Sequence, residues 1–134
     1  MKHILAILLA VIATTAAMAQ TIGEPKTHKF PSVTVAAFAD TIKSADVILV
    51  DVRMPKEYAD GHIEGAINVM WGKEFDNELT KANLDKKKVI AVYCRSGRRS
   101  KMAGDRLVEK GYSVVDLDKG IVGWQKEGGK VVTK

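Results

Sequence analysis

Residue types that cross-link proteins or bind metals are scarce in this sequence. Its 134 residues include one cysteine, Cys94, and three histidines. A single cysteine excludes an intramolecular disulfide, so the Cys94 thiol is free, bonded to another molecule or chemically active. His28 and His62, the two histidines outside the N-terminal segment, do not have the spacing of a zinc site with Cys94. We therefore expect no metal site and no cofactor.

Aromatic residues are also few, at 6% of the chain, although the formal net charge is +5. The basic residues concentrate in the segment from Lys86 to Lys110. Surfaces that bind nucleic acids usually interleave basic side chains with aromatic ones that stack on the bases. Because this interleaving is missing, we exclude a nucleic-acid partner and expect a small anionic substrate near the basic segment.

Long apolar runs are absent except at the N-terminus, where residues 4–13 are all apolar. A helix that spans a membrane needs about 20 such residues. Lys2 precedes the run, and the small residues Ala17 and Ala19 follow it, which is typical of a secretory signal peptide. We predict cleavage of residues 1–19, and hence a periplasmic or secreted protein without a stable membrane anchor. The alternative is an uncleaved anchor.

The remainder of the chain has the length of one small domain. Residues 20–31 are mostly polar without a period, which predicts an extended lead-in. Residues 32–134 suit a single hydrophobic core, and no internal repeat is present. We take a monomer as the default state.

Short apolar runs alternate with helical patterns along this domain. The β-branched runs predict short strands, at residues 47–50, 66–69, 89–93, 114–117 and 131–132. The periods, caps and stop signals predict helices at residues 32–43, from Pro55 to Gly61, at residues 75–83, from the Gly97 region to Gly111, and at residues 121–125. Continuous apolar strands are typical of sheets that are buried on both faces. The fold class is therefore α/β, with a central parallel sheet of about five short strands and helices on both faces.

Cys94 follows the predicted strand 89–93 directly. Ligands of open α/β sheets bind outside the carboxyl ends of the strands. The segment from Cys94 to Ser100 then leads into a helix, whose N-terminal N–H groups favour an anion. This segment also contains three arginines, Arg95, Arg98 and Arg99. Both features favour the Cys94 thiolate over the thiol, and the alternative is a buried, inert cysteine.

The same segment resembles the phosphate-binding loop of cysteine phosphatases only in part. In those enzymes an arginine follows the cysteine after five residues, and it grips the phosphoryl oxygens. Ser100 occupies that position here. The spacing therefore disfavours phosphatase or arsenate reductase chemistry and favours an anion of another size.

Several spaced motifs occur in one order along the chain. They are Asp51-Val52-Arg53, Glu57-Tyr58, Gly61-His62-Ile63, Gly65-Ala66, Asn68-Val69, the segment from Tyr93 to Ser100, Gly111-Tyr112, Gly120 and Trp124. In these motifs the sequence resembles the rhodanese (thiosulfate sulfurtransferase) family, and most of all its small single-domain exported bacterial members. The resemblance covers nearly the whole chain after residue 19, and it implies a rhodanese-like fold.

The resemblance implies covalent catalysis by Cys94 in two half-reactions. Cys94 would take the outer sulfur of a donor such as thiosulfate as a persulfide, and then give it to cyanide or a thiol. The donor would be bound by the loop and its amides, that is, by Arg95, Ser96, Gly97, Arg98, Arg99 and Ser100. The alternatives are a non-catalytic binding or anion-sensing module with the same fold and, less favoured, a phosphatase-like enzyme.

Two further expectations concern residues around the loop. Asp51 and Arg53 are expected to form a buried pair that braces the loop beside Cys94, and the alternative is that Arg53 also reaches the substrate. His62 invites a role as general base, but transfer from a thiolate needs none, so we expect a structural hydrogen bond. Lys119 stands where the family usually has a glycine; a positive φ there would cost about 1 kcal/mol.

Overall fold

The computed structural model describes residues 27–134. The predicted signal peptide, residues 1–19, and residues 20–26 of the predicted lead-in lie outside this range. No helix within residues 27–134 is long and apolar enough to cross a membrane.

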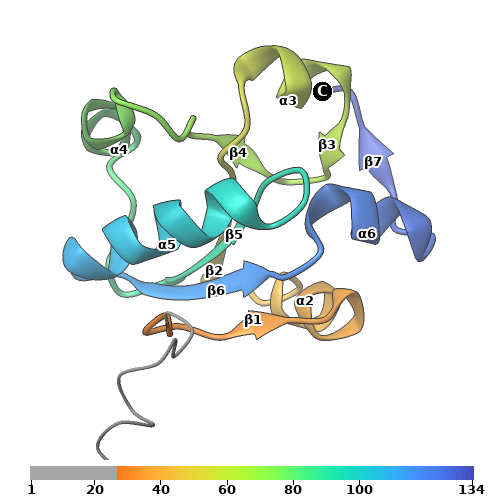
Figure 1. Cartoon of the computed structure of the whole chain (residues 1–134), viewed down its shortest axis with the longest axis horizontal. Coiled ribbons are helices and arrows are strands. Elements are labelled where there is room, and N and C mark those ends of the chain that lie inside the picture. The colour runs from red at the N-terminus through yellow and green to blue at the C-terminus, as the bar shows by residue number, and fades with distance from the viewer. Residues whose placement is uncertain (1–26) are drawn as a thin grey trace, which may run out of the picture.

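A sheet of five parallel strands forms the centre of the structure, in the order β1-β6-β5-β2-β4 (Figure 1). The strands are β1 (Ser32–Val33), β2 (Val47–Asp51), β4 (Ile67–Asn68), β5 (Val89–Tyr93) and β6 (Ser113–Leu117). β2, β5 and β6 are the long strands, and their β-branched residues suit a sheet that is covered on both faces. The predicted α/β fold with a central parallel sheet is confirmed.

Helices cover both faces of this sheet. They are α2 (Val35–Thr41), α3 (Pro55–Asp60), α4 (Phe75–Ala82), α5 (Arg98–Glu109) and α6 (Gly120–Lys126). Ile90 and Val92 of β5 pack in one core with residues of α4 and α5. Ala91 and Tyr93 point to the other face and pack with residues of α2 and α6. This alternation along β5 places Cys94 on the face that α5 covers.

The structure corrects the sequence interpretation at two short strands. The predicted helix 32–43 begins only at Val35, because Ser32 and Val33 are extended and pair with β6. Thr34 caps the helix, and its Oγ1 accepts a hydrogen bond from Ala37 N at 3.2 Å. Residues 131–132 are extended as predicted, but this strand, β7 (Val131–Val132), pairs antiparallel with β3 (His62–Ile63) outside the main sheet.

Phe30 and Gly104 form a contact that the sequence patterns do not indicate. Phe30 lies in the predicted lead-in, yet it is buried in the core beside α5. Met102, which fits the apolar stripe of α5 in the sequence, is 42% exposed. Gly104 faces the core instead, and a Cβ atom at this residue would lie 2.5 Å from Phe30 Cζ. Because Gly104 has no side chain, the Phe30 ring can pack directly against the backbone of α5.

We predict that Gly104→Ala destabilises the domain by about 1 kcal/mol net. Overpacking costs about 1–3 kcal/mol, whereas alanine in a helix gains about 1 kcal/mol over glycine. Urea denaturation measures the difference. The matched control is the same substitution in a Phe30→Leu background, where the smaller side chain should remove most of the loss. A more stable Gly104→Ala single variant would contradict the Phe30 contact.

Candidate active site

Cys94 lies at the carboxyl end of β5 with 1% of its surface exposed. Gly97 N donates a hydrogen bond to Cys94 Sγ at 3.1 Å, and Ser100 Oγ lies 3.5 Å from the same sulfur. A thiol donates to this hydroxyl, whereas a thiolate accepts from it. The sulfur also lies beside the N-terminus of α5, a helix of 12 residues whose dipole favours negative charge there. This geometry provides donors for a sulfur anion.

The carbonyl groups of the loop are bound by α6. Ile121 N donates to Cys94 O at 2.9 Å, and Val122 N donates to Arg95 O at 3.1 Å. The N–H and C=O of a trans peptide point in opposite directions. The amides of Arg95 and Ser96 therefore point away from α6 and are not used by that helix.

Two glycines permit this close packing. Gly97 has φ +99°, and a Cβ atom at this residue would lie 2.1 Å from Asp118 O. Gly120 has φ +61°, and its Cβ atom would lie 2.3 Å from Arg95 O. Lys119 has φ −93°, so this lysine carries no left-handed strain. The positive φ of the turn belongs to Gly120.

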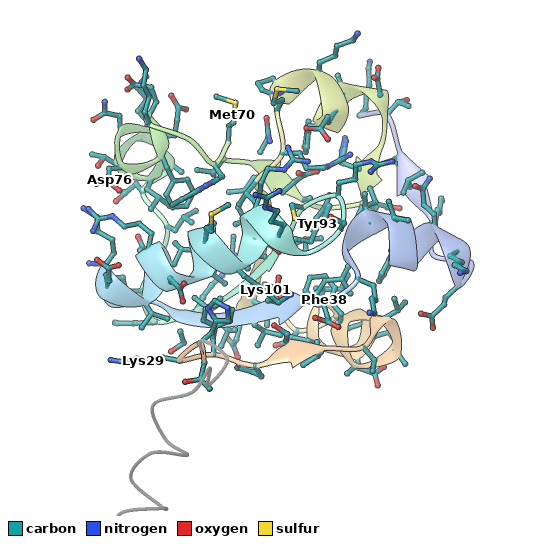
Figure 2. The ribbon with its side chains drawn as sticks, in the orientation of Figure 1. Lys29, Phe38, Met70, Asp76, Tyr93 and Lys101 are labelled. Atoms are coloured by element: carbon teal, nitrogen blue, oxygen red, sulfur yellow. The ribbon has the colours of Figure 1, made fainter. Side chains whose placement is uncertain are left out.

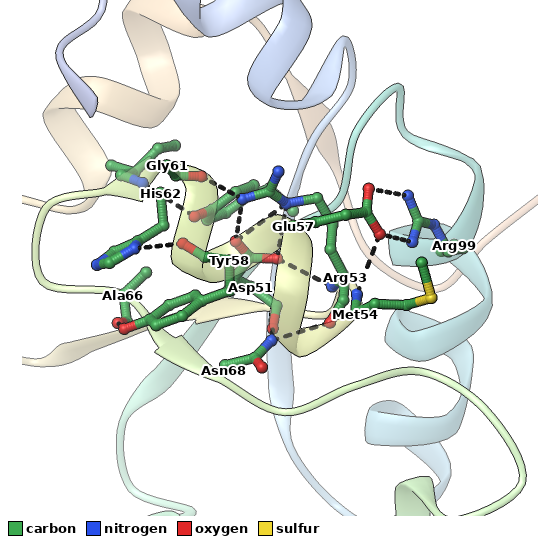
Figure 3. Close-up of polar contacts among 12 residues, drawn as sticks. Asp51, Arg53, Met54, Glu57, Tyr58, Gly61, His62, Ala66, Asn68 and Arg99 are labelled. Atoms are coloured by element: carbon green, nitrogen blue, oxygen red, sulfur yellow. Dashed lines mark hydrogen bonds and ion pairs between the residues drawn. The ribbon is translucent and has the colours of Figure 1, made fainter. Parts of the chain in front are cut away.

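The three arginines of the loop differ in their surroundings. Arg99 binds Glu57 of α3 with both terminal nitrogens, at 2.7 and 3.1 Å (Figure 3). This ion pair lowers the pKa of Glu57 and raises that of Arg99, chiefly through its hydrogen bonds. Arg95 and Arg98 are exposed, and neither forms an ion pair with another described residue. These two guanidinium groups are therefore open to an anion from solvent.

Ser96 and Ser100, the two serines predicted at the site, lie in different surroundings. Ser100 is fully buried beside the sulfur. Ser96 is exposed and lines a surface groove of about 610 Å³ along α6. The structure thus brings Gly97 and Ser100 to Cys94, whereas Ser96 lies on the outer side of the loop.

Asp51 and Arg53 form the predicted buried pair at the end of β2 (Figure 3). Arg53 Nη2 lies 2.7 Å from Asp51 Oδ2, and Arg53 Nε donates to Asp51 Oδ1 at 3.0 Å. Arg53 Nη2 also donates to Gly61 O at 2.6 Å. Burial opposes the charge on Arg53, but the hydrogen bond and the charge of Asp51 outweigh it and raise the Arg53 pKa.

This pair supports the strand that carries Cys94. The Arg53 guanidinium carbon lies 5.9 Å from the centre of the Tyr93 ring, and Tyr93 directly precedes Cys94. The Tyr93 hydroxyl accepts a hydrogen bond from Ile63 N at 3.0 Å. Burial, and next the charge of Asp51, raise the pKa of Tyr93 above its ordinary value. Tyr93 therefore remains a neutral, fixed support.

His62 is buried in a structural arrangement, as expected. Its Nδ1 lies 2.8 Å from Tyr58 O, where a protonated nitrogen donates a hydrogen bond. The imidazole stacks on the Tyr58 ring, with 3.7 Å between the ring centres. The hydrogen bond and the ring stacking both join β3 to α3, and neither involves a residue of the Cys94 loop.

The sequence interpretation missed a second ion pair beside the loop, in which a half-buried lysine meets a buried aspartate. Lys101 Nζ lies 3.0 Å from Asp116 Oδ2, 3.1 Å from Asp118 Oδ1 and 3.3 Å from Gly97 O. Burial opposes the charge of Lys101, but its hydrogen bonds to Asp116 and Asp118 outweigh this and raise the Lys101 pKa. The one available signal was an aspartate within the apolar strand 113–117. Among residues 27–134, no three His, Cys, Asp or Glu side chains cluster as metal ligands.

Comparisons with known protein families and with individual proteins agree with each other. The sequence pattern of the rhodanese-like domain matches residues 34–127. The thiosulfate sulfurtransferase PspE of Escherichia coli is 40% identical over 67 residues, which cover 50% of this chain and 64% of that protein. A sulfurtransferase of Allochromatium vinosum is 35% identical over 88 residues, which cover 65% of this chain and 79% of that protein. Thus the chain matches less than two thirds of PspE.

A solved structure agrees with these sequence relatives. A rhodanese-related protein from Thermoplasma volcanium superimposes with a TM-score of 0.67 at 33% identity. The match covers 78% of this chain and 100% of that one. The similarity therefore extends over the whole of the related domain.

We predict that Arg53→Met destabilises the protein by about 3–5 kcal/mol, because it leaves the Asp51 carboxylate buried without its partner. Urea denaturation of the purified variant measures the loss. The control is the double variant Asp51→Asn/Arg53→Met, which removes both charges and should recover a large part of it. Equal stability of Arg53→Met and the wild type would show that the buried Asp51 carboxylate does not depend on Arg53.

Proposed function

The chain belongs to the rhodanese-like domain family, and we propose that it is a sulfurtransferase that carries a sulfane sulfur on Cys94. The observation that carries this proposal is the position of Cys94 Sγ, which accepts the Gly97 N–H at the N-terminus of α5. Relatives named as sulfurtransferases support the same chemistry. No cofactor is required, because the cysteine itself holds the transferred atom.

In the first half-reaction the Cys94 thiolate attacks the outer sulfur of a donor such as thiosulfate. A bond forms between Sγ and this sulfur, the S–S bond of the donor breaks, and sulfite leaves with the electron pair. In the second half-reaction cyanide or a thiolate attacks the outer sulfur of the Cys94 persulfide. The persulfide bond then breaks, the acceptor keeps the sulfur, and the Cys94 thiolate returns.

The loop residues divide this work. Arg95 and Arg98 bind the sulfonate end of the donor, since they are exposed and unpaired among the described residues. Arg99 is held by Glu57 and contributes positive charge from a fixed position. The amides from Arg95 to Ser100 and the Ser100 hydroxyl stabilise the thiolate and the persulfide. Asp51 and Arg53 support the strand and do not touch the donor.

The test of this proposal is intact mass spectrometry after incubation with thiosulfate. We expect the wild type to gain the mass of one sulfur atom and Cys94→Ser to gain none. With cyanide added, the wild type should form thiocyanate, whereas Cys94→Ser and wild type alkylated with iodoacetamide should form none. Without sulfur loading and turnover, the binding-module alternative would replace the proposal. Hydrolysis of an aryl phosphate would point to the phosphatase alternative.

We also propose that the protein acts in the periplasm or outside the cell, as a monomer without a membrane anchor. The support is the sequence of residues 1–19, which has the form of a signal peptide. The full-length gene product, expressed in a bacterium and purified from the periplasm, should have the mass of residues 20–134. A full-length mass in the membrane fraction would show an uncleaved anchor instead.

A further inference from the structure

We propose that Lys101 is a positioning residue for the Cys94 loop: it binds the Gly97 carbonyl and thereby fixes the Gly97 N–H against the Cys94 sulfur. The inference rests on the proposed function, because it concerns the same thiolate. Lys101 itself does not touch the sulfur. Figure 2 shows its side chain on the side of α5 that faces β6.

The contacts of the Lys101 ammonium use its full donor capacity. An ammonium has three N–H donors, and three acceptors surround this one: Asp116 Oδ2, Asp118 Oδ1 and Gly97 O. Gly97 is also the residue whose N–H donates to Cys94 Sγ at 3.1 Å. The same residue thus binds the lysine through its carbonyl and the sulfur through its amide.

The two aspartates attach this lysine to the rigid end of β6. Asp116 is fully buried, its backbone N–H donates to Pro31 O at 2.9 Å, and its Oδ2 accepts from Ser32 Oγ at 2.8 Å. Asp118 follows β6, and its carbonyl oxygen is the atom that a Cβ at Gly97 would meet. Lys101 therefore connects the loop to the strand beside β5.

Packing alone does not account for this arrangement. Asp116 Oδ1 is buried and has no hydrogen-bond partner among the described residues. Apolar side chains of similar volume often replace buried ion pairs without loss of stability. The pair of Lys101 and Asp116 is therefore better explained by the position that it gives to Gly97. Two carboxylates surround the ammonium, so we expect it to act on the sulfur through geometry rather than through its charge.

The test measures how Cys94 reacts with iodoacetamide between pH 5 and 10 in the full chain. In Lys101→Met we expect the alkylation rate at neutral pH to fall about tenfold, as for one weakened hydrogen bond to a charged group. The pH of half-maximal rate should rise. Lys101→Arg, which keeps a cation at this place, should retain most of the wild-type rate.

Two further variants separate positioning from folding and from charge. Lys101→Met/Asp116→Asn removes one charge of each sign, so the net charge is unchanged and no unpaired Asp116 carboxylate remains. The pH of half-maximal alkylation rate should nevertheless rise as in Lys101→Met. Arg106→Met removes another α5 cation, which binds Asp76 and Glu109 away from the loop. It should leave the pH profile unchanged even if its melting temperature falls.

An unchanged profile in folded Lys101→Met/Asp116→Asn, or an equal change in Arg106→Met, would overturn the inference. Alkylation needs no sulfur transfer, so the outcome is independent of the thiosulfate assay. A wild type that alkylates but takes up no sulfur would reject the proposed function, while the pH profiles of the variants would still decide the role of Lys101.

Discussion

The hydrogen bonds from α6 to the carbonyls of Cys94 and Arg95 are the constraint on which the site depends. They turn these two peptides so that their N–H groups point away from α6. Such an approach requires Gly120, because a side chain there would overlap Arg95 O, and it requires Gly97 beside Asp118. These contacts hold the chain after Cys94 in one conformation, in which the Gly97 N–H faces the Cys94 sulfur.

Two ion pairs with buried aspartates flank this loop, one from each strand that pairs with β5. Asp51 and Arg53 lie at the end of β2, and Asp116 at the end of β6 binds Lys101 of α5. Both pairs also bind a backbone carbonyl, Gly61 O and Gly97 O respectively. Buried pairs give little net stability, but they restrict the arrangements that their neighbours can adopt. Arg53 lies against the Tyr93 ring, and Lys101 binds the Gly97 carbonyl in the loop of Cys94.

Local patterns indicated those parts of the site that are close in sequence. The strand 89–93, the cysteine after it and the helix start after Gly97 follow from periodicity and turn residues, and all are confirmed. Asp51 and Arg53 are two residues apart, so their pairing was also accessible. The partners of Arg99 and Lys101 were not, because Glu57 and Asp116 are distant in the chain and meet only after folding. The two-residue strands β1 and β3 carry too few residues for a periodic signal.

The cations around Cys94 fall into two groups, according to whether a carboxylate compensates their charge. Arg53, Arg99 and Lys101 each form an ion pair with a carboxylate. These cations therefore mainly fix the positions of the segments that they join. Arg95 and Arg98 have no such partner among the described residues, and both are exposed. Their charge is therefore available to a dianion that approaches from solvent. Dissolved salt screens this attraction until the dianion comes close to the loop. Compensated cations hold Cys94 and its loop in place, whereas uncompensated ones are available to the proposed donor.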